Sequence, residues 1–438
     1  MSTLNVDKVD PSTGTALELG TSGDTITVPT GAGLTVVDEV KTNKVSPATG
    51  TAFALGDSGD TFTVPSGATI VNSGTATGFG ITAANFRPNA QAIIINGNMD
   101  ISQRGTAIAD ESTSGVYRVD RMNIGMSSMG EVRLQQETLT SGNAFDNGFT
   151  EAFRIDCQVA DASPAAGDIL NMTYKLEGNS VQAFKKGTSN AEKFTLAFWV
   201  KSNKTVTAQV NLVDGDNSRM CSATYAVSSG DTWEHKVLNF AADTTGAFDN
   251  DNAKSLEIEF ALDAGSDFTS GAVPTAWEAS ANADRSVEDF ALQDNTSNDW
   301  AITGLQLEVG EYTSSTLPPF QFETFGDNLE RCCRYYQTCE NFTGVANDTN
   351  YFLGNAPKQF RMRIDNPTLG NPTTLQITDF YSADLSQTST GTISSLCDSP
   401  DKLLLYLGGF GGALTAGRAM GGTRNNANDN HITMDAEL

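Results

Sequence analysis

The chain has 438 residues and a lopsided charge: 27 Lys and Arg stand against 53 Asp and Glu, a net charge of −26. Its length predicts about three domains, and 39% apolar residues are enough to bury several cores. The acidity excludes a nucleic-acid binder and a polybasic membrane attachment, because both need a basic surface. The two histidines, His235 and His431, lie in unrelated contexts, which excludes most histidine-dependent catalysis. We therefore expect an acidic, mostly β protein that binds a partner without enzymatic activity or a cofactor.

Residues 1–80 contain an internal duplication, in which 9–29 recur at 45–65 with every matching pair 36 residues apart. Each copy reads as short strands broken by Gly, Pro and Ser-Gly-Asp turns, and holds too few apolar residues to bury a face. We expect these strands to wrap around those of identical subunits; an independent β-module acting as a spacer is the alternative. The start of the chain has no targeting or membrane segment, so we expect folding in a cytoplasm.

Residues 90–320 alternate between apolar and polar positions. The apolar positions are Leu170, Met172, Tyr174 and Leu176; Phe194, Leu196, Phe198 and Val200; and Leu256, Ile258, Phe260 and Leu262. Such strands, with Gly, Asn and Asp turns between them, predict an antiparallel jelly-roll sandwich. Cys157 should face its core. The six cysteines lack a CxxC pair and histidine partners, so we expect buried free thiols, with a disulfide or metal site as the alternative.

Acidic residues concentrate late in this region, where 15 stand against Lys254 and Arg285 between residues 243 and 311. A solvated face is one interpretation. Calcium binding at 214–217 and 249–252 is the other, because hard cations take several carboxylate and carbonyl oxygens. Neither run continues into an EF-hand loop, and turn chemistry selects the same residues.

The tryptophans bear on sugar binding, because an indole face can stack on a sugar. Trp199 lies in a strand, opposite the face of Phe194 and Phe198, and like Trp233 and Trp300 it is assigned to packing. Trp277 follows a proline in a loop and is a candidate carbohydrate-binding residue, with core packing as the alternative. Asp and Glu are too numerous to select a general acid and base, so no catalytic residue is predicted.

Residues 321–340 predict a short helical junction. Asp327 and Glu330 form a capping-box-like pair, and an apolar stripe follows. The stripe consists of Leu329, Cys332, Cys333 and Tyr336. Two arrangements of this helix are possible. It can form a three-helix collar with the helices of other subunits, or it can pack on the neighbouring sandwich.

Residues 341–438 read as a C-terminal β tip domain. The run 403–407 predicts a buried strand that leads into a glycine-rich loop. A phosphate cradle is excluded at this loop, because no Gly-Lys-Ser/Thr and no helical pattern follow.

Several stretches of the chain resemble bacteriophage tail fibres, in particular those of marine phages. They are INGNMDISQRGT at 95–106, YRVDR at 117–121, residues 194–202, TWE at 232–234, LQLEVG at 305–310, PF at 319–320, FGDNLERCCRYY at 325–336, FRMR at 360–363, DAEL at 435–438 and the GDTxTVPxGA elements of the repeats. The resemblance implies a carbohydrate-binding jelly roll in a homotrimeric virion protein. Its N-terminus would attach to tail hub, nozzle or adaptor proteins, and its distal part would contact the host. Cys333 stands where the family pattern predicts a polar residue, which raises an inter-chain role for its thiol.

Arg418, Arg424, Asn425 and Asn426 cluster in the glycine-rich loop of the tip. A planar guanidinium beside amides suits carboxylated or phosphorylated glycans, so these four residues join Trp277 as candidate carbohydrate-binding residues. Ordinary loop solvation is the alternative. The expected function is a phage tail fibre that adheres to a host-surface polysaccharide. A tailspike depolymerase and a purely structural tail or capsid decoration protein are the alternatives.

Overall fold

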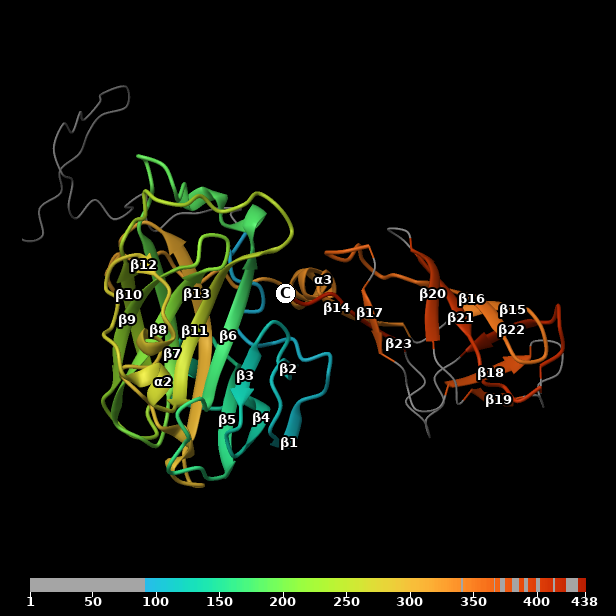
Figure 1. The fold of residues 1–438 in the computed structure, drawn as a ribbon, viewed down its shortest axis with the longest axis horizontal. Helices are drawn as coiled ribbons and strands as arrows, with labels where there is room; N and C mark the ends of the chain where they lie inside the picture. The colour runs from blue at the N-terminus through green and yellow to red at the C-terminus, as the bar shows by residue number, and fades with distance from the viewer. Residues whose placement is uncertain are drawn as a thin grey trace, which may run out of the picture. The chain divides into compact units, whose positions relative to one another are not determined.

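A computed structural model describes residues 91–339, 342–365, 367–370, 375–379, 386–389, 393–398, 402–412, 414–422 and 432–438. The chain divides into two units, Met1–Gly78 and Phe79–Leu438, and every described residue belongs to the second. The duplicated repeats of residues 1–80 lie outside the described residues. Within the second unit, a large β-sandwich is followed by a short helix and a smaller β-module (Figure 1).

The first sheet of the sandwich has six antiparallel strands. In spatial order they are β1 (Ala107–Glu111), β4 (Glu131–Thr138), β5 (Glu151–Val159), β13 (Asp299–Val309), β7 (Phe194–Lys201) and β10 (Glu234–Phe240). Strands far apart in sequence become neighbours here, since β13 lies between β5 and β7. This order is typical of a jelly roll rather than of a simple meander.

The second sheet has seven antiparallel strands. Their order is β12 (Glu278–Ala279), β9 (Arg219–Val227), β8 (Val206–Asp214), β11 (Lys254–Ala264), β6 (Ile169–Glu177), β3 (Asn123–Ser127) and β2 (Val116–Tyr117). Short helices connect some of the strands: α1 (Asn143–Asp146), α2 (Ser266–Thr269) and the 3₁₀ turns η2 (Gly178–Ser180), η3 (Gln182–Phe184), η4 (Asn282–Asp284) and η5 (Leu292–Asp294). Among the described residues, none of the helices is long and apolar enough to cross a membrane.

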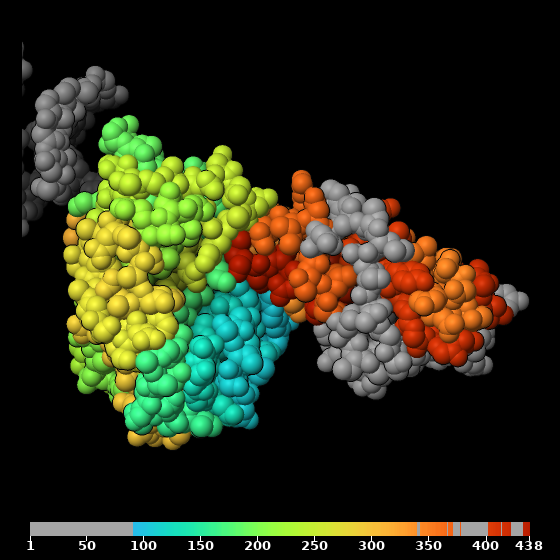
Figure 2. Space-filling view, in the orientation of Figure 1, coloured from blue at the N-terminus to red at the C-terminus, as the bar shows by residue number. Residues whose placement is uncertain are grey.

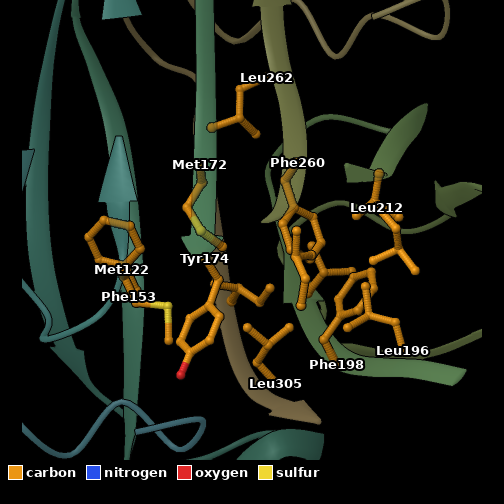
Figure 3. Packing of buried hydrophobic residues seen from close by; sticks show 14 of the residues in the cluster. Met122, Phe153, Met172, Tyr174, Leu196, Phe198, Leu212, Phe260, Leu262 and Leu305 are labelled. Carbon is orange, nitrogen blue, oxygen red and sulfur yellow. The ribbon is translucent and has the colours of Figure 1, made fainter. Parts of the chain in front are cut away.

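The core lies between the two sheets and is filled by the alternating residues that the sequence predicts (Figure 3). Met172 and Tyr174 of β6 and Phe260 of β11 come from one sheet and are fully buried. Leu196 and Phe198 of β7 meet them from the other, and the rings of Phe198 and Phe260 pack edge to face at 5.0 Å. Each such side chain stabilises the fold by about 1.5–3 kcal/mol. The predicted antiparallel sandwich and the inward position of Cys157 are confirmed.

The predicted junction helix is α3 (Phe325–Cys333), but its cap differs from the prediction. Thr324 is the N-cap, and its hydroxyl accepts a hydrogen bond from the backbone N–H of Asp327. Asp327 is therefore the third helical residue and completes the cap by accepting from the Thr324 hydroxyl at 2.7 Å. The side chain of Asn328 bonds to Asn96, so the helix packs on its own sandwich. A collar with helices of other subunits stays a prediction.

The C-terminal β-module contains two antiparallel sheets. The smaller has the order β14 (Tyr336–Cys339), β23 (Ile432–Asp435) and β17 (Thr368–Gly370). The larger has the order β19 (Ser386–Ser389), β18 (Leu375–Asp379), β22 (Ala419–Gly422), β15 (Phe342–Ala346), β16 (Phe352–Pro357), β21 (Lys402–Leu407) and β20 (Ile393–Asp398). The run 403–407 is buried on one face alone, because Leu404 and Tyr406 remain partly exposed. The predicted strand over 403–407 is therefore present as β21, with Leu403, Leu405 and Leu407 buried.

The end of the chain returns to the sandwich (Figure 2). The carboxylate of Glu437 pairs with Arg121, which is 2% exposed, and with Arg104 at 3.3 Å. The ammonium of Lys175 donates to the carbonyl oxygen of Leu438 at 2.7 Å. Strands β14 and β23 pair with each other, so the chain leaves the sandwich and comes back on neighbouring strands. The charged residues at the chain end thus hold the module to the sandwich.

Candidate functional site

A cleft of about 370 Å³ lies on the outer face of the six-stranded sheet. Its floor comes from β13 and β7, one wall from the turn that leads into β5, and the other from the segment after β13. The lining residues are Asn147, Phe149, Trp199, His235, Gly304, Gln306, Ser314, Leu317, Pro318, Pro319, Phe320 and Phe322. None of these described residues carries a formal charge when His235 is neutral, and aromatic rings supply much of the surface.

Gly304 creates the floor of the cleft. Its φ of +63° lies in the left-handed region, and the register between β13 and β7 shifts between Thr303 and Gln306. A Cβ atom at this position would lie 2.7 Å from Cζ of Phe149 and 3.0 Å from Cδ1 of Trp199. Both rings can therefore approach the sheet only because residue 304 has no side chain.

Two strands present a pair of rings side by side on this face. Trp199 of β7 lies directly opposite His235 of β10 in the register, and their ring centroids are 4.9 Å apart with an angle of 31° between the planes. Burial, with a smaller contribution from the ammonium of Lys236, lowers the pKa of His235 below its ordinary value. The imidazole is therefore neutral near pH 7, and it can both donate and accept a hydrogen bond.

The two walls meet in a cluster of three phenylalanines, Phe149 from the turn before β5 and Phe320 and Phe322 from the segment after β13. The ring of Phe149 packs edge to face on Phe320 at 4.9 Å and lies 5.1 Å from the ring of Phe322. Gln306 fixes the segment that carries the last two rings, because its side-chain amide donates to the carbonyl oxygen of Pro318 at 3.0 Å. This cluster is therefore built by packing and by a hydrogen bond to the strand beneath it.

Charged side chains occupy the same sheet face beside the cleft. Arg154 of β5 bonds to Asp299 of β13 at 2.8 Å, and Lys201 of β7 bonds to Glu137 of β4 at 3.0 Å. The Lys201 ammonium also lies 5.2 Å from the ring centroid of Trp233. These charges pair with one another, so the face changes from ion pairs at one end to neutral aromatic surface at the other.

Trp277 does not belong to this cleft, and the structure corrects its candidate role. Its side chain is in the core, 8% exposed, and its indole N–H donates to the carbonyl oxygen of Ala241 at 2.7 Å. The ring packs against Phe194 on one side. A ring enclosed in this way cannot stack on a sugar, so Trp277 is a packing residue.

The other candidate residues lie in the C-terminal module. Arg418 immediately precedes β22, is half-buried, and its carbonyl oxygen accepts from the backbone N–H of Ala346 at 2.9 Å. Arg424, Asn425 and Asn426 lie outside the described residues, and their role stays a prediction. Of the predicted residues that the structure describes, Trp277 lies in the core of the sandwich and Arg418 in the C-terminal module, so these two do not share a site.

The acidic runs considered for calcium meet a lysine instead. Asp214 is fully buried and pairs with the ammonium of Lys186, which also contacts Asp243 at 3.0 Å and the carbonyl oxygen of Gly246 at 2.8 Å. Asp249 uses its backbone N–H to bond to Asp216. Within the described part of the chain, no three His, Cys, Asp or Glu side chains gather as a cation site. The ammonium of Lys186 thus supplies a positive charge beside Asp214 and Asp243, and calcium binding at the two runs stays a prediction.

Cys157, Cys221, Cys332 and Cys333 are free and buried, as predicted, and Cys339 is buried as well. Burial raises the pKa of Cys333 to about 12, and its thiol lies 3.7 Å from the side-chain oxygen of Gln103. A buried, protonated thiol is a poor partner for a second chain. Cys333 is 1% exposed within its own chain, and an inter-chain role for its thiol stays a prediction.

The sequence contained part of the signal for the cleft. Trp199 lies on the side of β7 opposite Phe194 and Phe198, so its outward position follows from strand parity. The roles of His235 and Gly304 do not follow in this way, because each depends on a neighbour brought close by pairing of distant strands.

No family model matches the chain, and no curated protein matches it. Among solved structures it is similar to the enzymatically active domain of tailspike protein 4 of bacteriophage CBA120, with 14% identity over 50% of this chain and 21% of that one and a TM-score of 0.26. It is similar to the N-terminal cellulose-binding domain of Cellulomonas fimi β-1,4-glucanase C, with 14% identity over 51% of this chain and 100% of that domain and a TM-score of 0.24. A family 11 carbohydrate-binding module of Clostridium thermocellum shows 9% identity over 49% of this chain and 98% of the module, with a TM-score of 0.23.

At these identities and TM-scores, the ligand and activity of this chain must be argued from its own residues. The fold itself is an antiparallel jelly-roll sandwich carrying a C-terminal β-module.

Proposed function

We propose that the sandwich binds a neutral glycan in the cleft beside Trp199. The observation that carries this proposal is an aromatic cleft whose described lining holds no charged group, on a sheet face that is otherwise covered by ion pairs. The C–H faces of a sugar ring suit the indole of Trp199 and the ring of Phe322, which is 50% exposed. Its hydroxyl groups suit the neutral imidazole of His235 and the amide of Asn147, both of which lie at the cleft.

The proposal includes binding without cleavage. Glycoside hydrolysis usually requires two carboxyl groups flanking the scissile bond. The described residues that line the cleft include neither Asp nor Glu, and on the neighbouring face Asp299 and Glu137 are paired with Arg154 and Lys201. This supports adhesion over a depolymerase.

At the level of the particle, we propose that the chain is a homotrimeric phage tail fibre attached to the tail through its N-terminus. The motifs at 95–106 and 325–336 support this role, and they lie in parts of the chain that meet in the structure: Asn96 bonds to Asn328. Three sites per fibre and several fibres per virion raise the effective concentration, so that each site can be weak. A host-surface polysaccharide is the expected ligand.

The test is binding of the full chain to a panel of neutral and acidic bacterial polysaccharides, with Trp199→Ala and Val159→Ala as variants. We expect a neutral polysaccharide to bind, and Trp199→Ala to weaken its affinity by about tenfold or more, as for a central aromatic contact. Val159 is also exposed and apolar, 47% exposed at the end of β5, and its variant should bind normally.

Three results would contradict the proposal. Binding of none of the polysaccharides by the folded protein would favour a structural decoration protein. Equal loss in both variants would place the site elsewhere. Shortened polysaccharide chains after incubation would favour a tailspike depolymerase.

A further inference from the structure

The larger sheet of the C-terminal module has two unlike faces. Along β15, β16 and β21 the residues alternate strictly between a buried and a more exposed side. The buried side belongs to the module core, which includes Phe342, Phe352, Leu403, Leu405 and Leu407. The other side carries Thr343, Val345, Leu353, Asn355, Leu404 and Tyr406, which we call the outer face.

The outer face is apolar over neighbouring strands. Val345, Leu353 and Tyr406 lie opposite one another in the register and so form one row across three strands. Leu404 and Asn355 form part of the next row. Val345 is 43% exposed, and Tyr351, whose ring stacks on Tyr406 at 4.8 Å, is 37% exposed. Three strands therefore present aliphatic and aromatic side chains to solvent.

The sequence of β21 is that of a strand covered on both sides. Five consecutive apolar residues, Leu403 to Leu407, are typical of a strand buried on two faces, whereas a strand with one wet face alternates. The module core covers Leu403, Leu405 and Leu407, which leaves Leu404 and Tyr406 for a contact beyond the module.

Charge and surface chemistry select the occupant. The chain has a net charge of −26, so two copies repel unless they meet where charge is absent. The rows formed by Val345, Leu353 and Tyr406 and by Thr343, Asn355 and Leu404 contain no charged residue; Lys402 lies at the end of β21 on the same side. A sugar fits this surface poorly, since valine and leucine offer no hydrogen bond and the two tyrosine rings already stack on each other.

We propose that the outer face of β15, β16 and β21 is the contact through which copies of this chain associate. The inference rests on the self-association included in the proposed function, but not on glycan binding. It assigns a separate surface to each activity: the cleft of the sandwich takes the ligand, and the outer face of the module takes a second copy.

The experiment measures the mass of the full chain in solution by light scattering and analytical ultracentrifugation. The double variant V345E/L404E places two carboxylates in the contact, and we expect the self-association constant to fall by about a hundredfold or more, because like charges would face each other in the contact. The control is Val159→Glu, which places one carboxylate on an exposed valine of the sandwich and should leave the mass unchanged.

A second variant keeps the test decisive if the first does not fold. V345K/L404K carries the opposite charge and should by itself lower the self-association constant, because like charges again face each other. Where both variants fold, mixing them should restore the oligomer if the faces meet. Circular dichroism checks folding, and polysaccharide binding per chain in the dissociated variant checks the cleft independently.

A monomeric wild-type protein would overturn both the self-association and this interface. An oligomeric wild type whose mass survives in both folded double variants would overturn the interface alone. Normal mass with loss of polysaccharide binding in V345E/L404E would also overturn it, because the outer face would then be a glycan site.

Discussion

The outer faces of the sandwich and of the C-terminal module are built in opposite ways. On the sandwich, Arg154 and Lys201 sit in ion pairs and the neutral aromatic surface is confined to a hollow around Gly304. On the module, Val345, Leu353 and Tyr406 form a row over consecutive strands. A hollow with polar neighbours suits a small hydrated ligand, whereas a broad apolar surface suits another protein. The two faces therefore suit different partners, and the proposed ligand binding and the proposed assembly fall on different sheets.

The largest effect should come from the joint between these two regions. Replacing Glu437 by alanine leaves the buried guanidinium of Arg121 without its carboxylate partner. We expect the free energy of unfolding to fall by about 3–5 kcal/mol, since an uncompensated buried charge is costly. Denaturant titration of the full chain measures it.

The control for Glu437→Ala is Glu311→Ala. Glu311 pairs with Lys193 at 2.6 Å on the surface of the sandwich. An exposed pair of this kind contributes about 0–1 kcal/mol. Equal effects of the two variants would show that the chain end does not hold the module to the sandwich.

The next effect concerns the hollow itself. In Gly304→Ala, a Cβ atom collides with Phe149 and Trp199, so the two rings must move and polysaccharide binding should be lost. The left-handed φ also costs about 1–3 kcal/mol of stability. Calorimetric titration with the bound polysaccharide measures the first effect, and thermal unfolding the second.

Gly115→Ala is the control for Gly304→Ala, because it adds the backbone strain without filling the cleft. Gly115 has a φ of +83°, and no atom lies within 4 Å of the position that a Cβ would take, so this variant should show the strain with normal binding. If Gly304→Ala binds as well as Gly115→Ala, the floor of the cleft lies elsewhere.

The last effect is a pH dependence of the sandwich, which is small for each pH unit. Burial, followed by the nearby carboxylate of Asp289, raises the pKa of Asp263 from 3.8 to about 7. The protonated form therefore contributes stability that is complete below pH 3.8 and is lost as the pH rises through 7. The free energy of unfolding should decline by about 1 kcal/mol per pH unit within this window.

Asp263→Asn tests the direction of this pH dependence, because the side chain of asparagine is uncharged at every pH. Its unfolding free energy should decline less between pH 5 and 8 than that of the wild type, and should exceed it at pH 8. An unchanged slope would assign the effect to Asp289 or to Asp120, whose pKa values are both raised to about 6.

Strand parity and local chemistry made much of the sandwich predictable. The alternating residues around Met172, Phe198 and Phe260 fix which side of each strand is buried, because successive side chains point to opposite faces. The same parity placed Trp199 on the outside. Strand parity could not tell whether the side chain of Trp277 is buried or exposed in its loop. Its burial depends on contact with Phe194, which is more than eighty positions away in the chain.

The sequence by itself determined the class of fold, the inward side of the long strands and the burial of the free thiols. These properties depend on residues close together in the chain, where a period of two or a turn residue acts directly. The tertiary structure alone decided the cleft and the outer face of the module. His235 meets Trp199 only because β10 pairs with β7, Gly304 meets Phe149 only because β13 lies beside β5, and Tyr406 joins Leu353 only when β21 pairs with β16. Such contacts arise from strand order, which no local pattern specifies.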